Sequence, residues 1–230
     1  MNKNNLAVIV GGTGAIGDSI AHEICKIGFS DVLKIGTKTT PSIDFNNENT
    51  ILDAIEFVKK KNKPISIFFD ATGILHENNV MPEKSLKKIE FEFVKKNFII
   101  NAIGPALLIK HFTPLLDKEE KSVFASLSAK VGSISDNGYG GWYSYRASKA
   151  ALNQFIKTAS IEMKVKNRNA IFVALHPGTV RSNLSEPFQK TNLKIQNPEE
   201  SAKHLVKIIN SIDQSQTGKF FNWDGSEIPW

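Results

Sequence analysis

The sequence predicts a single-domain α/β protein in which helices cover both faces of a doubly wound parallel sheet. Three observations predict this fold class. The chain has 230 residues, enough for one such domain with a sizeable core. Short apolar runs that suit buried strands alternate with longer segments of helical apolar spacing, and a glycine-rich turn joins the first strand to the first helix. The expected domain spans residues 1–230, with right-handed crossovers between its strands.

The first half of the chain supplies four expected strands and two expected helices. The apolar run 6–10 ends in glycines and suits a buried strand, and the isoleucines of segment 16–27 are spaced for a helix that ends at Gly28. The other elements of this half are strands at 32–35, 42–44 and 65–69, and a helix at 49–61 that Pro64 separates from the strand after it.

The second half begins with a long helix, expected over residues 91–116. The dipeptide Gly104-Pro105 lies inside this helix and predicts a bend, because proline lacks a backbone donor and crowds the preceding turn. The later elements are strands at 122–127 and 170–175, helices at 143–165 and 198–212, and a last strand at Phe220 and Phe221. The polar stretch 182–197 follows the sixth strand at the carboxyl edge of the sheet, so it is a candidate lid over a ligand.

The composition limits the kinds of binding partner that we expect. The net charge of +6 comes largely from lysine clusters, which we interpret as solvated helix faces. Because aromatic residues are not interleaved with these lysines, no nucleic-acid partner is expected. A net positive charge suits an anionic cofactor or substrate. The five histidines do not have the spacing of zinc ligands, so no metal is expected.

Cysteine content and apolar runs indicate the compartment. The one cysteine, Cys25, cannot form an internal disulfide and is expected to be a small buried hydrophobe. The chain starts with a polar segment, and the apolar run after it is too short for a signal peptide. No apolar run approaches the length of a membrane span. We therefore expect a cytoplasmic protein without a membrane partner.

The turn Gly11-Gly12-Thr13-Gly14-Ala15-Ile16-Gly17 predicts a dinucleotide site. Glycine permits a tight turn and close approach by a diphosphate, whose charge then meets the N-terminus of the following helix. The glycine pattern alone is a weak signal, and an ordinary tight turn is the alternative. Its place between a first strand and an amphipathic helix favours Rossmann-type binding. Ala15 stands where many such turns have glycine, and its side chain is small.

The end of the second strand indicates which dinucleotide is expected. An acidic residue there would bind the adenosine ribose and favour NAD. The sequence instead has Thr37 and Lys38, which suit a 2′-phosphate, so we expect NADP, with NAD as the second choice. The alternative for Lys38 is a solvated loop charge. Asp44 is placed either to approach the adenine or to cap the helix that starts near Glu48.

Tyr145 and Lys149 are the strongest catalytic signal, because residues four apart lie on one face of a helix. An ammonium beside the phenol favours the phenolate. Bringing a tyrosine from its ordinary pKa of about 10 to neutrality takes roughly 4 kcal/mol, which a close ammonium and a second cation supply in a poorly solvated site. Such a tyrosine exchanges protons with a substrate hydroxyl or carbonyl. The alternative is a tyrosine at a subunit contact beside a solvated lysine.

With these motifs placed, the chain resembles the short-chain dehydrogenase/reductase family along nearly its whole length. The matching pieces occur in the family's order: the glycine turn, Asp70-Ala71-Thr72-Gly73, Asn101, Ser128, Tyr145 with Lys149, and Pro177-Gly178. Within the family, the stretches 128–137, 176–180 and 222–230 are similar to the C-factor branch. The resemblance implies NAD(P) binding and hydride transfer to or from an alcohol or carbonyl carbon.

The C-factor likeness also supports a second reading. C-factor-like proteins are linked to bacterial intercellular signalling, so the alternative is a signalling or regulatory protein that binds the dinucleotide with little turnover. Tyr145 and Lys149 are both retained, and this favours the enzyme. Helix 143–165 and the apolar stretch 98–108 match helices that build a four-helix subunit interface in the family. The resemblance therefore implies a homodimer or homotetramer.

The resemblance implies roles for single residues. Tyr145 would be the general acid/base, and Lys149 would lower its pKa and hold the nicotinamide ribose. Ser128 would orient the substrate oxygen, and Asn101 would support a water chain to Lys149. The expected cofactor contacts, from the motifs and the resemblance together, are Gly11, Thr13, Gly14, Ala15, Ile16, Gly17, Thr37, Lys38, Asp44, Ala71, Thr72, Gly73, Asn101, Tyr145, Lys149, Pro177, Gly178, Val180 and Ser182.

Two positions depart from the family pattern. The family serine usually stands closer to the tyrosine than Ser128 stands to Tyr145, and a glycine-containing insertion accounts for the longer spacing. Ser133 fits the usual count and is the alternative serine. Asp70 stands where the family usually has asparagine. The sequence does not name the substrate.

Overall fold

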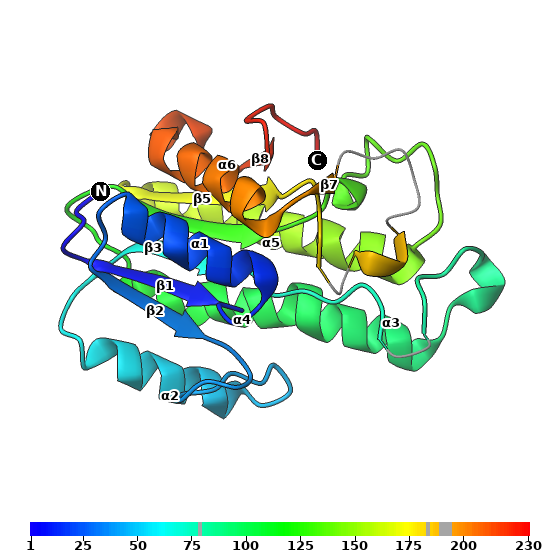
Figure 1. Ribbon diagram of the computed structural model, residues 1–230, viewed down its shortest axis with the longest axis horizontal. Coiled ribbons are helices and arrows are strands. Elements are labelled where there is room, and N and C mark those ends of the chain that lie inside the picture. Colours follow the sequence, from blue (N-terminus) through cyan, green and yellow to red (C-terminus); the bar gives the residue numbers. More distant parts are fainter. Residues whose placement is uncertain (78–79, 183–184, 189–194) are drawn as a thin grey trace.

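Six parallel strands form one sheet in the computed structural model, which describes residues 1–77, 80–182, 185–188 and 195–230 (Figure 1). In spatial order they are β2 (Asp31–Ile35), β1 (Leu6–Val10), β3 (Ile65–Asp70), β4 (Ser122–Leu127), β5 (Ala170–His176) and β8 (Lys219–Asn222). The doubly wound parallel sheet is confirmed. Its winding reverses between β1 and β3, where such sheets hold their ligands at the carboxyl ends of the strands.

The segment 42–44 does not form the strand that the sequence predicted. It makes isolated bridges in place of a ladder. The carboxylate of Asp44 accepts hydrogen bonds from the backbone and side chain of Asn46, both at 2.9 Å, and the Asp44 backbone donates to the Thr50 hydroxyl at 2.9 Å. Aspartate and asparagine favour such turns, so the segment is a turn that leads into α2 (Glu48–Lys59).

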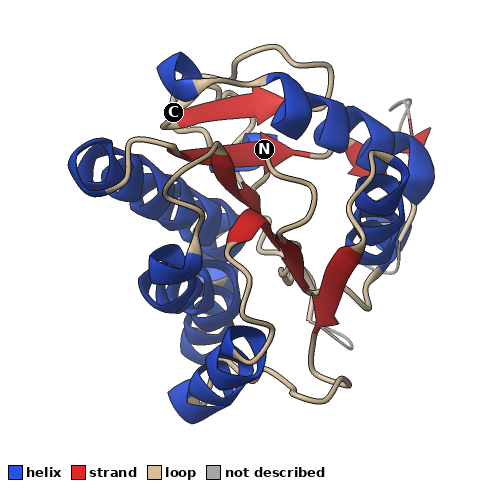
Figure 2. Ribbon diagram, turned by 90° about the vertical axis from the view of Figure 1, so that its left-hand side faces the viewer, coloured by secondary structure: helices blue, strands red, loops and turns tan. Residues whose placement is uncertain are grey.

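Helices cover both faces of the sheet (Figure 2). α1 (Ala15–Lys26) and α6 (Pro198–Ser211) pack on one face and bury one apolar cluster. α2, α4 (Gly104–Phe112) and α5 (Tyr143–Lys166) pack on the other face and bury a second cluster. A short parallel ladder of β6 (Thr179–Val180) and β7 (Ile195–Gln196) lies apart from the main sheet.

Alternation along β3 shows which face each side chain occupies. Phe68 belongs to the cluster on the α4 and α5 side, where its ring stacks on Phe124 with centroids 4.5 Å apart. Ile67 and Phe69 belong to the cluster under α1 and α6. Because successive side chains of a strand point to opposite faces, Asp70 shares the face of Phe68. A carboxyl group therefore ends β3 on the side of the sheet that α5 covers.

A π turn interrupts the long helical run. α3 (Phe91–Phe98) is followed by a π-helical segment, Ile99–Ile103, and α4 begins at Gly104. Pro105 therefore lies in the first turn of α4, where its missing donor costs no hydrogen bond. The predicted irregularity exists, but it is a π turn that ends just before the dipeptide rather than a bend at it.

Two expectations from composition need correction. Cys25 is exposed rather than buried, because Ile20 and Ile24 form the buried face of α1. Among the described residues, the helical run 91–115 has the length and composition to cross a membrane, although it contains no unbroken apolar run of that size. One such helix is weak evidence of a membrane span, and this run packs against α5 within the fold.

Candidate active site

The turn between β1 and α1 presents backbone groups to a cavity. Gly11 has a φ of +76°, and a Cβ on Gly17 would lie 2.3 Å from the Gly11 carbonyl oxygen, so both positions require glycine. Gly14 is the N-cap of α1 and has no side chain to cap it, which leaves the first N–H groups of α1 available to an anion. These open backbone donors fit the diphosphate of a dinucleotide.

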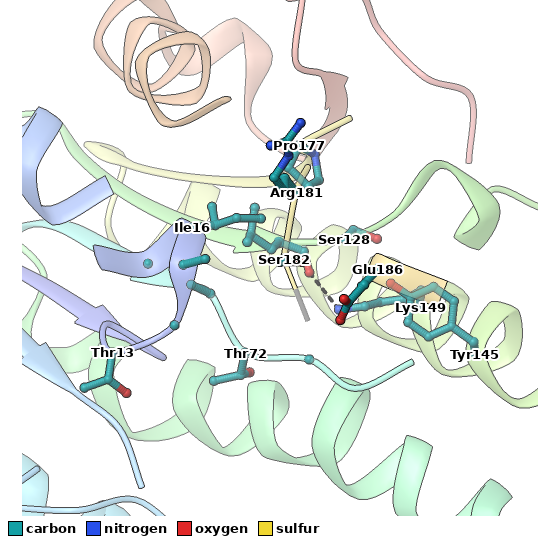
Figure 3. Close-up of a pocket in the computed structure, with 16 residues that line it drawn as sticks. Thr13, Ile16, Thr72, Ser128, Tyr145, Lys149, Pro177, Arg181, Ser182 and Glu186 are labelled. Carbon is teal, nitrogen blue, oxygen red and sulfur yellow. Dashed lines mark hydrogen bonds between the residues drawn. The ribbon is translucent and has the colours of Figure 1, made fainter. Parts of the chain in front are cut away.

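A cavity of about 860 Å³ opens at the carboxyl edge of the sheet (Figure 3). Thr13 lies at one end, Tyr145 and Lys149 lie at the other, and Thr72 lies between them. This volume falls in the range of ligand sites, roughly 300–1,000 Å³. The lining residues are Thr13, Gly14, Ala15, Ile16, Gly17, Ala71, Thr72, Gly73, Leu127, Ser128, Tyr145, Lys149, Pro177, Arg181, Ser182 and Glu186.

Tyr145 and Lys149 lie one turn apart on α5 and are 7% and 2% exposed. Burial raises the pKa of the Tyr145 hydroxyl and lowers the pKa of the Lys149 ammonium to about 8. Lys149 Nζ donates to the Leu127 carbonyl at 2.8 Å (dashed in Figure 3). Burial is the cause of the raised pKa of Tyr145 in this structure, and the expectation that Lys149 makes Tyr145 acidic stays a prediction. At neutral pH the phenol keeps its proton.

Ser128, rather than Ser133, lines the cavity. Ser128 directly follows β4, is 3% exposed, and donates from Oγ to Asn153 Oδ1 at 2.6 Å. Ser133 is also buried, but its Oγ accepts a hydrogen bond from the Asp136 backbone at 3.1 Å within the following loop. Only the first of these two serines therefore shares the cavity with Tyr145.

Asn101 lies in the π turn and is fully buried. Its Nδ2 donates to the Ile74 carbonyl at 2.9 Å and to Ser148 Oγ at 3.1 Å, and its Oδ1 accepts from the Ile74 backbone at 2.8 Å. A Cβ on Gly73 would lie 3.5 Å from Asn101 Oδ1 and 3.4 Å from Lys149 Nζ. Asn101 therefore holds the loop after β3 beside Lys149, although it lies outside the cavity lining.

The loop after β3 lines the middle of the cavity through Ala71, Thr72 and Gly73. The Ala71 backbone donates to the Val10 carbonyl at 2.8 Å, which ties the loop to β1. Thr72 donates to Asp70 Oδ1 from its backbone at 3.0 Å and from its hydroxyl at 2.6 Å. These bonds hold the loop backbone along the cavity, where the sequence placed cofactor contacts.

The end of β2 lies beside the cavity rather than in its lining. Thr37 and Lys38 are exposed and lie outside the cavity lining. The Thr39 hydroxyl accepts a hydrogen bond from the Gly36 backbone at 2.9 Å and folds the turn back on itself. Gly36 lies close to Thr13, since a Cβ on Gly36 would lie 2.9 Å from Thr13 Oγ1. Thr37 and Lys38 directly follow Gly36, which lies at the Thr13 end of the cavity. They do not themselves line the cavity there.

Asp44 is exposed, lies outside the cavity lining and does not cap α2. The N-cap is Asn47, whose side chain accepts from the Asn49 backbone at 3.1 Å. Hydrogen bonds from Asn46 lower the pKa of the Asp44 carboxyl. Asn47 directly precedes Glu48, the first residue of α2, so Asn47 rather than Asp44 forms the cap.

Backbone geometry sets the segment after β5. Pro177 lines the cavity, whereas Gly178 and Val180 lie outside its lining. Gly178 has a φ of +78°, and a Cβ there would lie 2.5 Å from Gln196 Nε2. Gly178 therefore permits close packing of the chain at this point. Val180 is buried.

The candidate lid 182–197 is described in part. Residues 183–184 and 189–194 lie outside the described residues. Of the described part, Ser182 lines the cavity as predicted, and Glu186 lines it as well. Arg181, just before the lid, also lines the cavity, and both charged side chains are exposed. The sequence did not single out Arg181 or Glu186, because loop composition does not show which side chains face a cavity.

Sequence reasoning missed Glu83, which holds the start of α5. Glu83 is 2% exposed, and its carboxylate accepts from the Ser144 backbone at 3.2 Å and from the Ser144 hydroxyl. Its backbone carbonyl accepts from the backbone of Trp142, which has a φ of +52° and packs edge-on against Tyr145. Glu83 is 61 residues from Ser144, so no local pattern could have indicated the contact.

Comparison with known protein families shows which family the chain belongs to. The model of the short chain dehydrogenase family matches residues 5–193. The chain therefore belongs to the short-chain dehydrogenase/reductase family. It is an oxidoreductase that acts on CH–OH or C=O groups, with a nicotinamide dinucleotide as its cofactor.

Individual relatives show the same relationship. The chain is 25% identical to the 1-hydroxy-2-glutathionyl-2-methyl-3-butene dehydrogenase of Rhodococcus sp. (strain AD45), over 97% of this chain and 98% of that protein. It is 29% identical to C-signal of Myxococcus xanthus, over 64% of this chain and 84% of that protein. The NADPH-bound carbonyl reductase from chicken fatty liver has the same fold, with a TM-score of 0.85, 19% identity and coverage of 99% and 94%.

Proposed function

We propose that the protein is an NADP-preferring oxidoreductase that transfers hydride between nicotinamide and an alcohol or carbonyl carbon, with Tyr145 as the acid/base. One observation carries the proposal. The buried pair of Tyr145 and Lys149 lies at one end of a cavity whose other end is the uncapped start of α1. The bound cofactor supplies the hydride, and the protein supplies orientation and control of charge.

The side chains at the Tyr145 end suit reduction of a carbonyl group. The carbonyl carbon gains the hydride, and its oxygen takes the proton of the Tyr145 hydroxyl, which burial keeps protonated at neutral pH. The Ser128 hydroxyl lines the same cavity and orients the same oxygen. The positive charge of Lys149 stabilises the phenolate as the proton leaves. In alcohol oxidation the same groups act in the reverse direction.

Three features support a preference for NADP. The end of β2 has no carboxylate to bind a free ribose 2′-hydroxyl. Lys38 stands exposed two residues beyond Gly36, which lies close to Thr13 at that end of the cavity. The carbonyl reductase from chicken fatty liver, which has the same fold, binds NADPH. Fluorescence titration is expected to show tighter binding of NADPH than of NADH, and a preference for NADH would contradict this part of the proposal.

A Tyr145→Phe variant tests the proposed catalysis. Turnover of a panel of carbonyl compounds, measured by nicotinamide absorbance, is expected to fall by about 10³-fold because the proton donor is lost. NADPH binding, measured by fluorescence, is expected to change little. Tyr143→Phe is the matched control, since Tyr143 lies on the same helix outside the cavity lining. Equal activity of the Tyr145→Phe variant and the control would rule out Tyr145 as the proton donor.

The similarity to C-signal supports a second candidate, a signalling or regulatory protein that binds the dinucleotide with little turnover. The Tyr145→Phe variant separates the two candidates. A biological output that survives this substitution, in a protein that turns over no compound of the panel, would favour the signalling role. An output that is lost together with turnover would favour the enzyme.

We also propose that the chain forms a homodimer or homotetramer through the side of the molecule where α4 and α5 lie. Apolar side chains of the π turn and α5 are exposed there: Ile103 is 46%, Phe155 43% and Ile161 58% exposed. Burying such side chains against a second copy would be favourable. Light scattering on the eluting protein is expected to give a mass of two or four chains, and a monomer at all concentrations would contradict the proposal.

A further inference from the structure

Asp70 is a carboxyl group buried behind the cavity. It ends β3, is 0% exposed and faces the α5 side of the sheet. Its Oδ1 accepts two hydrogen bonds from Thr72, at 3.0 and 2.6 Å. Its Oδ2 is buried and accepts no hydrogen bond among the described residues, although the hydroxyl of Ser126, its neighbour in register on β4, acts to lower the pKa of the carboxyl. Such a buried carboxyl stays ionised only with a compensating charge nearby, and otherwise it takes up a proton.

Lys149 supplies that charge. Its ammonium reaches from α5 to the carbonyl of Leu127, the residue directly after Ser126. Burial raises the pKa of the Asp70 carboxyl, and the Lys149 ammonium acts to lower it. Burial lowers the pKa of Lys149, and the Asp70 carboxyl acts to raise it. Geometry places the two groups near each other: Asp70 pairs in register with Ser126, and the next residue of β4, Leu127, accepts from Lys149 Nζ at 2.8 Å.

Apart from Glu83, whose buried carboxylate accepts from Ser144 at the start of α5, the other charged groups near Lys149 are exposed to solvent. Arg181 and Glu186 line the open side of the cavity, where water screens them. Lys130, on the short helix that packs against α5, is exposed and paired with Asp136 at 3.4 Å. Tyr145 faces the cavity beside Lys149 and is neutral, and Asn101, Ser126 and Ser128 carry no charge. Among the described residues, Asp70 is the buried charge partner of Lys149.

We propose that Asp70 is a positioning residue that balances the ammonium charge of Lys149 from inside the sheet and keeps that charge beside Tyr145. The proposal concerns the catalytic pair of the proposed function, and only its kinetic consequence rests on that function. Removing one partner of a buried pair leaves the other charge uncompensated. Without Asp70, the buried lysine is expected to release its proton at a lower pH.

The Asp70→Asn variant tests this most directly. Asparagine keeps the shape of the side chain and the oxygen that accepts from Thr72, and it removes the charge. The titration of Lys149 is followed by NMR of its side-chain nitrogen and carbon, without cofactor or substrate. The midpoint is expected to fall by about one pH unit or more in the variant. A folded variant with the wild-type midpoint would overturn the proposal.

A matched control comes from the opposite end of β3. Asp117 is 5% exposed and accepts from Asn5 Nδ2 at 2.6 Å, and its backbone donates to the Ile65 carbonyl at 2.9 Å. Asp117→Asn also removes a buried carboxylate, but far along the strand from Lys149. It is expected to leave the Lys149 midpoint unchanged. An equal shift in both variants would show a general loss of packing and would overturn the proposal.

A reciprocal measurement keeps the test decisive if Asp70→Asn fails to fold. In Lys149→Met, the carboxyl carbon of Asp70 is expected to titrate at a higher pH than in the wild type, because an interaction between two sites acts equally on both. In an active enzyme, Asp70→Asn also moves the pH profile of kcat/KM. A shifted Lys149 midpoint without any turnover would contradict the proposed function alone. Normal turnover without a shifted midpoint would contradict the role of Asp70 alone.

Discussion

The two ends of the cavity differ in what forms them. At the Thr13 end, the backbone forms the site, through glycines that leave room and N–H groups at the uncapped start of α1. At the Tyr145 end, buried side chains form it, and two ionisable side chains, Lys149 and Asp70, are buried at or behind its wall. The Thr13 end can bind a ligand only where no side-chain atoms fill the space beside the backbone. The Tyr145 end needs charges that compensate one another.

This difference predicts different sensitivities. A backbone site tolerates no added atom, and it contains no group that titrates near neutral pH. A site of buried side chains tolerates small changes of shape, but it responds to pH and to the loss of a partner. Substitutions at the two ends are therefore expected to produce different losses, and three experiments test this, from the largest effect to the smallest.

Gly17→Ala is expected to have the largest effect. The added Cβ would lie 2.3 Å from the Gly11 carbonyl oxygen, so the turn and the start of α1 must shift. The free energy of unfolding, measured by chemical denaturation, is expected to fall by about 3 kcal/mol, and NADPH binding is expected to be lost. Gly138→Ala is the control, because a Cβ there would meet nothing within 4 Å. Wild-type affinity in Gly17→Ala would show that the backbone end tolerates added atoms.

His176, at the carboxyl end of β5, is expected to make the stability of the protein depend on pH. It ends β5, its Nδ1 is buried without a hydrogen-bond partner among the described residues, and burial lowers its pKa from 6.5 to about 4. Between these two values the unfolded chain binds more protons than the folded one. The free energy of unfolding therefore falls as the pH falls through this window. Its contribution is fully present above about pH 6.5.

Denaturation at pH 7 and pH 4 measures this contribution. Between these two pH values, the free energy of unfolding of the wild type is expected to fall by about 2 kcal/mol more than that of His176→Leu. This value is smaller than the full pKa shift would give, because His176 is intermediate in burial. His22→Leu replaces an exposed histidine of α1 and is expected to keep the wild-type pH dependence. Identical pH dependence in all three proteins would remove His176 from the explanation.

Glu83 is expected to give the smallest effect, and one confined to the Tyr145 end. Glu83→Ala removes the acceptor for Ser144 at the start of α5, which is expected to cost about 1 kcal/mol of stability. A less well-held Tyr145 is expected to lower kcat about tenfold. Glu83→Gln keeps an acceptor and is expected to recover most of the activity, while NADPH affinity stays near the wild-type value in both. A loss of affinity without a loss of kcat would show that the two ends are coupled.

The fold was predictable wherever local pattern and tertiary structure agree. The apolar run 6–10 and the glycine turn after it form β1 and the start of α1, because an unbroken apolar run is buried on both faces. The strand expected at 42–44 is a turn, since the polar side chains around Ile43 form local hydrogen bonds. The π turn at 99–103 has no residue signature of its own, so the sequence pointed instead to Gly104 and Pro105.

The residues that form the site were easier to predict from the sequence than their protonation and contacts. The spacing of Tyr145 and Lys149 placed both in one cavity, but spacing does not reveal how strongly each is desolvated. The cavity lining separates Ser128 from Ser133, which the sequence left open. Thr37 and Lys38 lie outside the cavity lining, in a turn that the Thr39 hydroxyl closes by accepting from the Gly36 backbone. Glu83 depends on pairing with a segment far along the chain, and no local pattern carries that information.

The π turn has one further consequence, for the two halves of the long helical run. A π turn holds one residue more than the α-helical turn it replaces, and each residue rotates a helix by about 100°. Side chains before and after it therefore follow stripes that are out of phase. α3 packs against α5, while α4 packs against α2 as well. A single inserted residue thus turns the apolar face of the helical run from one direction before the π turn to another direction after it. A regular helix of the same length would keep one apolar face throughout.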